Sequence, residues 1–117
     1  MPAAKSQLDV GRITELQALL GTDREAIVGT LLTELTNAVA RINEGLACDD
    51  LDEVAAAAHA ARNSALMIDA QPVLRVLRQL ETCARNNEPE GALAARARLR
   101  RTWPRLRRQL EEAAAAR

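Results

Sequence analysis

The chain contains one histidine, His59, and this residue offers the most distinctive chemistry in the sequence. An imidazole can act as a nucleophile near neutral pH, because a large fraction of such rings is uncharged there. At about 100° per residue, residues 54–70 form a helix with an apolar face and a polar face. His59 falls on the polar face, and Arg62 follows one helical turn later. The spacing predicts an exposed imidazole with a guanidinium close by.

Small side chains surround the histidine on this predicted outward face. The face also carries Ala55, Ala56, Asn63 and Leu66, and its histidine is a candidate functional residue. The alternative is a solvated histidine on an ordinary surface helix, since alanine is simply a strong helix former. Ser64 is expected to pack or hydrogen-bond inward, against a neighbouring helix.

The composition indicates a purely helical protein with one domain. The chain has 117 residues, enough for a single core, and it is rich in Leu and Ala. Phe and Tyr are absent, and Trp103 is the sole aromatic residue. We expect one domain over residues 1–117, with residues 1–7 loose.

Apolar residues recur at helical spacing in five segments, and polar or Gly/Pro-containing breaks separate them. The first is short, over residues 8–20, and the second runs from about residue 23 to about residue 47. Asp49 or Asp50 is expected to cap the helix that carries His59, which ends near residues 68–69. Asp69 is expected to cap the next helix, and the last begins near Pro89 and runs to the C-terminal alanines. This order predicts an all-α fold, an antiparallel up-down-up-down four-helix bundle with a short additional N-terminal helix.

Charge is distributed unevenly, although the formal net charge is zero. Residues 1–60 hold four basic and ten acidic side chains, and residues 61–117 carry the opposite excess. Most of the basic excess comes from seven arginines of the last helix: Arg96, Arg98, Arg100, Arg101, Arg105, Arg107 and Arg108. They spread around the helix with little aromatic interleaving, so we interpret them as a solvated face and expect no nucleic-acid partner. A nucleic-acid-binding helix stays an alternative, and it predicts steeply salt-dependent binding.

Other features narrow the function classes. Cys48 and Cys83 lack metal-ligand spacing, so we interpret them as reduced thiols of a cytoplasmic protein. No signal peptide or long apolar run is present, and no membrane association is expected. One histidine without a Glu-x-x-His pattern cannot build a dinuclear metal site in a bundle core.

The residues around His59 follow a recognisable pattern. Without a gap, the chain reads His59-Ala60-Ala61-Arg62-Asn63-Ser64, then Asp69-Ala70, then Val73, Val76, Leu77 and Leu80-Glu81. This run resembles the histidine-containing phosphotransfer (HPt) domain of bacterial two-component phosphorelays. That family's signature is roughly His-x-Leu-Lys-Gly-Ser, then Gly-Ala, then a leucine-patterned helix ending in Leu-Glu. Here Arg62 stands in place of Lys, and Asn63 and Asp69 stand in place of Gly.

The resemblance implies a phosphocarrier without catalysis of its own. His59 would accept a phosphoryl group from a receiver-domain aspartate and pass it to another, with electrostatic support from Arg62. The implied partners are a response-regulator receiver domain and a hybrid histidine kinase. The resemblance implies that the partner would contact Ala55, Ala56, Asn63 and Leu66. The protein would need no cofactor, because the receiver domain supplies Mg²⁺, and it would be a monomer. The alternative is a helical adaptor that binds a receiver domain or kinase without being phosphorylated.

Overall fold

The computed structural model describes residues 11, 15 and 24–115, and this part of the chain is all-helical, without a strand. Four helices follow one another: α2 (Arg24–Ala47), α3 (Leu51–Met67), α4 (Gln71–Arg85) and α5 (Pro89–Ala115). These bounds confirm the four long helices expected from the apolar spacing. The predicted short helix over residues 8–20 lies outside the described residues, apart from residues 11 and 15, as do residues 1–7.

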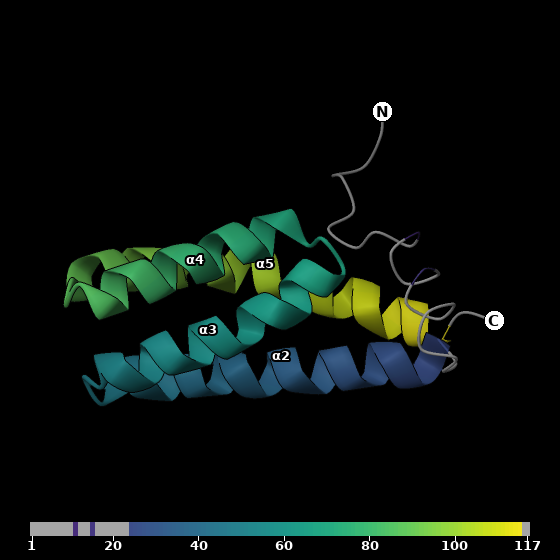
Figure 1. Cartoon of the computed structure of the whole chain (residues 1–117), viewed down its shortest axis with the longest axis horizontal. Coiled ribbons are helices and arrows are strands. Elements are labelled where there is room, and N and C mark those ends of the chain that lie inside the picture. The colour runs from purple at the N-terminus through teal and green to yellow at the C-terminus, as the bar shows by residue number, and fades with distance from the viewer. Residues whose placement is uncertain (1–10, 12–14, 16–23, 116–117) are drawn as a thin grey trace.

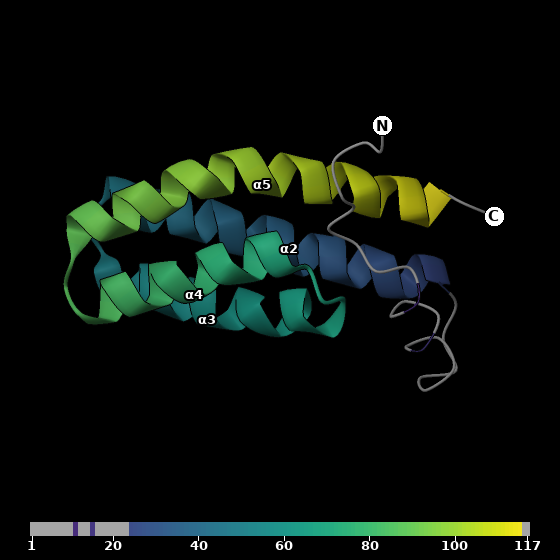
Figure 2. The same ribbon diagram turned by 90° about the horizontal axis from the view of Figure 1, so that it is seen from above.

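Each of the four helices packs against two others. Helix α2 contacts α3 and α5, and α4 likewise contacts α3 and α5. The α2–α3 and α4–α5 turns lie at one end of the bundle, and the α3–α4 turn lies toward the other (Figures 1 and 2). Helix α3, which carries His59, is therefore flanked by α2 on one side and α4 on the other.

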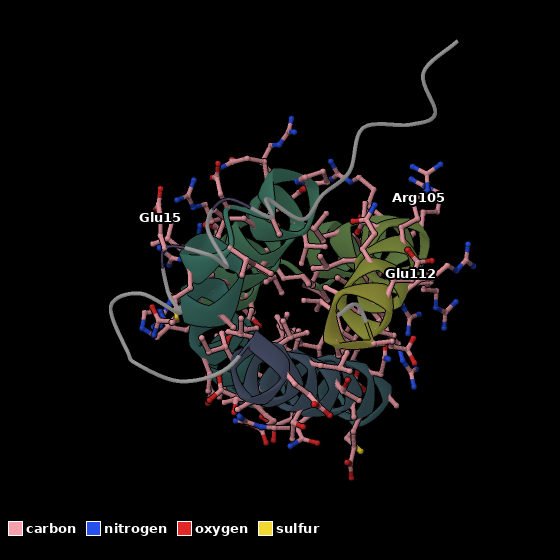
Figure 3. All side chains as sticks on the ribbon, turned by 90° about the vertical axis from the view of Figure 1, so that its right-hand side faces the viewer. Glu15, Arg105 and Glu112 are labelled. Atoms are coloured by element: carbon pink, nitrogen blue, oxygen red, sulfur yellow. The ribbon has the colours of Figure 1, made fainter. Side chains whose placement is uncertain are left out.

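The core consists of the apolar stripes expected from the sequence. Its largest fully buried side chains come from all four helices and from Ile68, the C-cap of α3; the helical ones are Val28, Leu35, Ile42, Val54, Leu74, Leu77, Leu80, Leu99, Leu106 and Leu110. In an end-on view, side chains fill the space between the helices, whereas Arg105 of α5 points outward (Figure 3). Burial of this apolar area is the main force that holds the helices together.

Two local features bring α3 close to α2 at its first turn. The Asp50 side chain caps the helix by accepting a hydrogen bond from the Glu53 backbone N–H at 3.1 Å. Gly45 of α2 faces this turn, and a Cβ there would lie 2.8 Å from Cγ2 of Val54. A side chain at position 45 would thus push the start of α3 away from α2.

The prediction that Asp69 caps α4 was wrong. The N-cap of α4 is Ala70, which makes no side-chain hydrogen bond, and Asp69 instead has a left-handed φ of 52°. The Ala70 N–H bonds the Ala65 carbonyl at 2.9 Å, and the Asp69 N–H bonds the Leu66 carbonyl at 3.1 Å. This is the Schellman arrangement, in which the residue after the C-cap adopts the conformation that glycine prefers. Capping signals for two adjacent helices overlap in this three-residue turn, and the end of α3 determines the backbone of Asp69.

The left-handed backbone makes residue 69 a test of turn strain. Glycine adopts this conformation without a steric penalty, whereas alanine has the full penalty. Aspartate is intermediate because its side chain can hydrogen-bond to nearby backbone groups. We expect Asp69→Gly to raise the free energy of unfolding by about 0.5–1 kcal/mol and Asp69→Ala to lower it by a similar amount. Urea denaturation of the three proteins measures the order. Equal stability of the Gly and Ala variants would contradict it.

Candidate functional site

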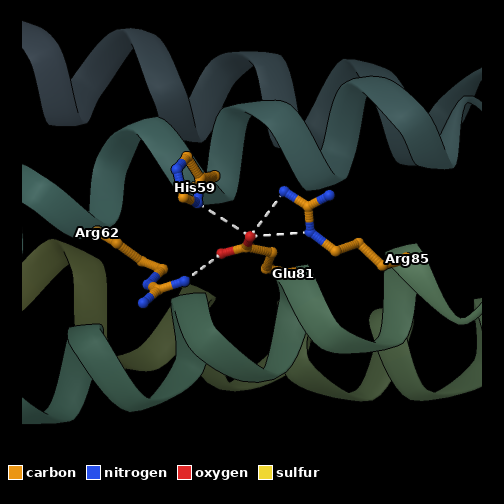
Figure 4. A network of polar contacts seen from close by, with 4 residues as sticks. All are labelled: His59, Arg62, Glu81 and Arg85. Atoms are coloured by element: carbon orange, nitrogen blue, oxygen red, sulfur yellow. Dashed lines mark hydrogen bonds and ion pairs between the residues drawn. The ribbon is translucent and has the colours of Figure 1, made fainter.

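His59 lies in the middle of α3 and its side chain is 57% exposed, as the helical spacing predicted. Its ring does not point freely into solvent on both sides. The Nδ1 atom lies 3.0 Å from Oε2 of Glu81, which belongs to α4 (Figure 4). Among the described residues, no hydrogen bond is made by the Nε2 atom of this ring.

The carboxylate of Glu81 is the centre of the cluster, and its side chain is only 8% exposed. Arg62 of α3 donates from Nη1 to Oε1 at 2.6 Å. Arg85, one turn further along α4, donates from Nε to Oε2 at 2.9 Å, and its Nη2 lies 2.8 Å from the same oxygen. One buried carboxylate therefore joins three nitrogen-bearing side chains from two helices (Figure 4).

The electrostatics of the cluster favour the ionised form of Glu81. Burial by itself would raise the pKa of this carboxyl, but hydrogen bonds from Arg62, Arg85 and His59 outweigh it. The pKa of Glu81 therefore lies below its usual value, and the group is a carboxylate at neutral pH.

This charge state determines which ring nitrogen of His59 carries a proton. An ionised carboxylate only accepts hydrogen bonds, so Nδ1 must be the donor in the contact with Glu81. A neutral imidazole has a single N–H group, and its other nitrogen has a free lone pair. In the neutral ring the nucleophilic atom is thus Nε2.

The face around the ring is close to the predicted one, with one correction. Ala56, Asn63 and Leu66 are exposed, Leu66 by 50%. Ala55, which we expected on the outward face, is instead 6% exposed and belongs to the core, so it offers no surface to a partner. The buried arc of α3 is wider than a single stripe because α4 packs against the side of the helix that carries Arg62.

The other flank of α3 faces α2. Ser64 is buried and its Oγ donates to Oε2 of Glu34 at 2.7 Å, which confirms the predicted inward hydrogen bond. A hollow of about 470 Å³ lies along this seam, lined by Asn63, Met67 and Arg41 among others. Asn63, the residue that replaces a family glycine, therefore stands at the edge of a groove beside the histidine.

Sequence reasoning missed two members of the cluster, Glu81 and Arg85. Glu81 was seen only as the end of a leucine pattern. The sequence does place Glu81 on the apolar stripe of α4, four residues after Leu77 and three before Ala84, and this position could have identified it. A carboxylate on an apolar stripe requires partners, because an unpaired buried charge is strongly unfavourable. The identity of those partners depends on how α3 and α4 pack.

Within the described residues, no group of three or more His, Cys, Asp or Glu side chains could hold a metal ion. None of the helices in this part of the chain has the length and apolar character needed to span a membrane.

The lowered pKa of Glu81 makes stability depend on pH. Its contribution is present above the unfolded value of about 4.5 and is lost as the pH falls through the lower folded value. We expect Glu81→Gln to reduce the free energy of unfolding by about 1–3 kcal/mol at pH 7, with the difference shrinking below about pH 4.5. Urea denaturation at a series of pH values measures this.

Glu88→Gln is the matched control, since Glu88 is an exposed carboxyl with no ion pair among the described residues. We expect this variant to follow the wild type at every pH. A Glu81→Gln protein as stable as the wild type at pH 7 would contradict the assigned role of the carboxylate.

Comparison with known protein families gives one match. The model of the Hpt domain family matches residues 26–116, which includes all of α3, α4 and α5 and nearly all of α2. No curated protein and no solved structure matches the chain. Hpt domains are phosphocarrier modules of phosphorelay signalling, and they interact with response-regulator receiver domains and kinases. The chain belongs to the Hpt domain family.

Proposed function

We propose that His59 is the phosphoacceptor of a phosphorelay intermediate. It receives a phosphoryl group from the aspartate of one receiver domain and passes it to the aspartate of another. The observation that carries this proposal is the orientation of the ring: Nδ1 is bound to Glu81, and the exposed ring leaves Nε2 free. A partner domain can therefore reach the nucleophilic nitrogen directly.

The transfer step follows from the tautomer. The Nε2 lone pair of His59 attacks the phosphorus of the aspartyl phosphate, and the bond from phosphorus to the aspartate oxygen breaks, releasing a carboxylate. The Nδ1 proton stays on the ring, where the Glu81 carboxylate stabilises the positive charge that develops during attack. Transfer to a second receiver reverses these changes. Glu81 is thus a positioning residue, because it acts through the imidazole.

Arg62 provides positive charge for the phosphoryl oxygens. Its guanidinium binds Glu81 through Nη1, its side chain is 36% exposed, and other N–H groups of the fork remain available. Arg85 binds the same carboxylate from the opposite side and adds a second guanidinium near the ring. Two cations beside the imidazole favour a phosphoryl group, whose charge spreads over several oxygens.

The exposed face of α3 around His59 is the proposed docking surface. A receiver domain or a hybrid histidine kinase would dock over Ala56, Asn63 and Leu66, which surround His59 on α3. Mg²⁺ and most catalytic groups would belong to the receiver, so the carrier would need no cofactor and no catalysis of its own. We further propose that it acts in the cytoplasm as a monomer. An antiparallel up-down-up-down bundle presents this face, and the three-residue turns between consecutive helices support that topology.

Transfer from a labelled receiver domain tests the proposal. We expect the wild type to acquire an acid-labile phosphoryl label from a cognate phosphorylated receiver and His59→Gln to acquire none. Since His59 is the only histidine in the chain, phosphohistidine in the wild type can arise at no other position. Circular dichroism and receiver binding of the variant verify that the bundle and its docking face are intact.

The same assay separates the carrier from the adaptor. A wild type that binds a receiver with the same affinity as His59→Gln, yet stays unlabelled with every phosphorylated receiver of its organism, would be an adaptor. That result would overturn the phosphoacceptor assignment.

Arg62 is tested by the rate of transfer. Loss of one charge-assisted contact to the phosphoryl group should slow transfer by about tenfold or more in Arg62→Gln, and Arg62→Lys should restore part of the rate. Rapid-quench measurement of label on the protein gives these rates, and Arg101→Gln is the control for loss of one positive charge. Equal slowing in Arg62→Gln and Arg101→Gln would show that the rate depends on the net charge of the protein, and would contradict a specific contact between Arg62 and the phosphoryl group.

A further inference from the structure

A second candidate site lies between α2 and α5, on a different side of the bundle from His59. A cavity of about 160 Å³ opens there, and Asn43 from α2 and Arg96, Arg100 and Trp103 from α5 line it. Leu99 and Pro104 add apolar wall. His59 in contrast lies on α3 and bonds α4, so the cavity shares no residue with the cluster around Glu81.

The two arginines of this cavity have no carboxylate partner among the described residues, as is also true of exposed arginines of the same helix such as Arg98 and Arg101. Arg41, Arg62, Arg85 and Arg107 each lie within ion-pair distance of a glutamate. No such ion pair is made by Arg96 or Arg100 within the described residues. Helix α5 itself offers no carboxylate near these two arginines, because it has no acidic residue between Glu90 and Glu111.

Arg96 is the more constrained of the two. Its Nε atom is buried and has no hydrogen-bond partner in the part of the chain that the structure describes. A buried donor without an acceptor is destabilising, and for a charged group the penalty is larger. Arg100 follows one helical turn later on the same side of α5, so two like charges adjoin one cavity. One negatively charged group with several acceptor oxygens in the cavity would offset both guanidinium charges.

We propose that this cavity binds a small oxyanion of the phosphate class. Arginine forks match phosphate oxygens in geometry, and the Asn43 amide can donate a further hydrogen bond. The buried indole of Trp103 and the other apolar walls lower the local dielectric, which strengthens the attraction. The volume suits a single phosphate-sized group.

The sole aromatic residue makes the site measurable. Trp103 is 7% exposed and lines the cavity, so its fluorescence reports on this place alone. Titration of the full chain with sodium phosphate, against sodium chloride at equal ionic strength, should give a saturable change with phosphate only. We expect Arg96→Gln and Arg100→Gln each to weaken this binding by at least about tenfold.

Arg98→Gln is the matched control, because Arg98 is an exposed arginine of the same helix and does not line the cavity. It should bind phosphate as the wild type does. The side-chain amide of Asn43, followed by NMR, gives a readout that does not depend on the indole, and thermal unfolding verifies that each variant is folded.

Several outcomes would overturn the site. These are an equal response to chloride, a response to acetate but not to phosphate, or equal weakening by Arg98→Gln and Arg96→Gln. Any of them would leave the phosphoacceptor proposal intact, because His59 and Glu81 are not part of this cavity.

Discussion

The buried carboxylate of Glu81 is the interaction on which the site depends. It accepts from an imidazole and two guanidiniums, and these donors come from both α3 and α4. Without it, three side chains that carry or can acquire positive charge would face one another at close range. With it, the packing of α3 against α4 fixes the position and orientation of the His59 ring. The same carboxylate links stability and chemistry, since its charge both holds the helices in register and selects the tautomer.

Much of the fold could be predicted from the sequence because helical periodicity is a local signal. The stripes of α4 and α5 recur at three- and four-residue spacing, and the residues so predicted are buried. The exposed position of His59 followed from the same count. Asp50 was a correct N-cap because a cap needs only its own helix.

The errors arose where two elements meet. Ala55 is one position outside the apolar stripe, and it is buried because the packing of α3 against its neighbours covers a wider arc than that stripe. Asp69 lies in a turn where the end of α3 and the start of α4 compete, and the backbone at the end of α3 prevails. The partnership of Glu81 with His59 spans 22 residues, so no local pattern could reveal it. Contacts between helices, rather than the helices themselves, define this site.

Acidic and basic side chains lie on different parts of the molecule. The acidic excess lies in residues 1–60, with four acidic side chains (Asp49, Asp50, Asp52 and Glu53) around the α2–α3 turn, whereas α5 holds seven arginines. Its outward arginines, such as Arg98 and Arg101, form a solvated face, as the sequence suggested. Arg96 and Arg100 differ because they adjoin a cavity beside the only aromatic residue. The fold thus places two arginine-containing sites on separate helix pairs, and among the described residues the arginines of only one of them have a carboxylate partner.

The central claim concerns a single proton on His59, and nitrogen NMR observes it directly. Long-range proton–nitrogen correlation of the wild-type ring, recorded at a pH where the ring is neutral, distinguishes a protonated from an unprotonated nitrogen. We predict a protonated Nδ1 and an unprotonated Nε2, because the Glu81 carboxylate can only accept a hydrogen bond. A neutral ring with its proton on Nε2 would contradict it, since the outward nitrogen would then have no lone pair for phosphorus.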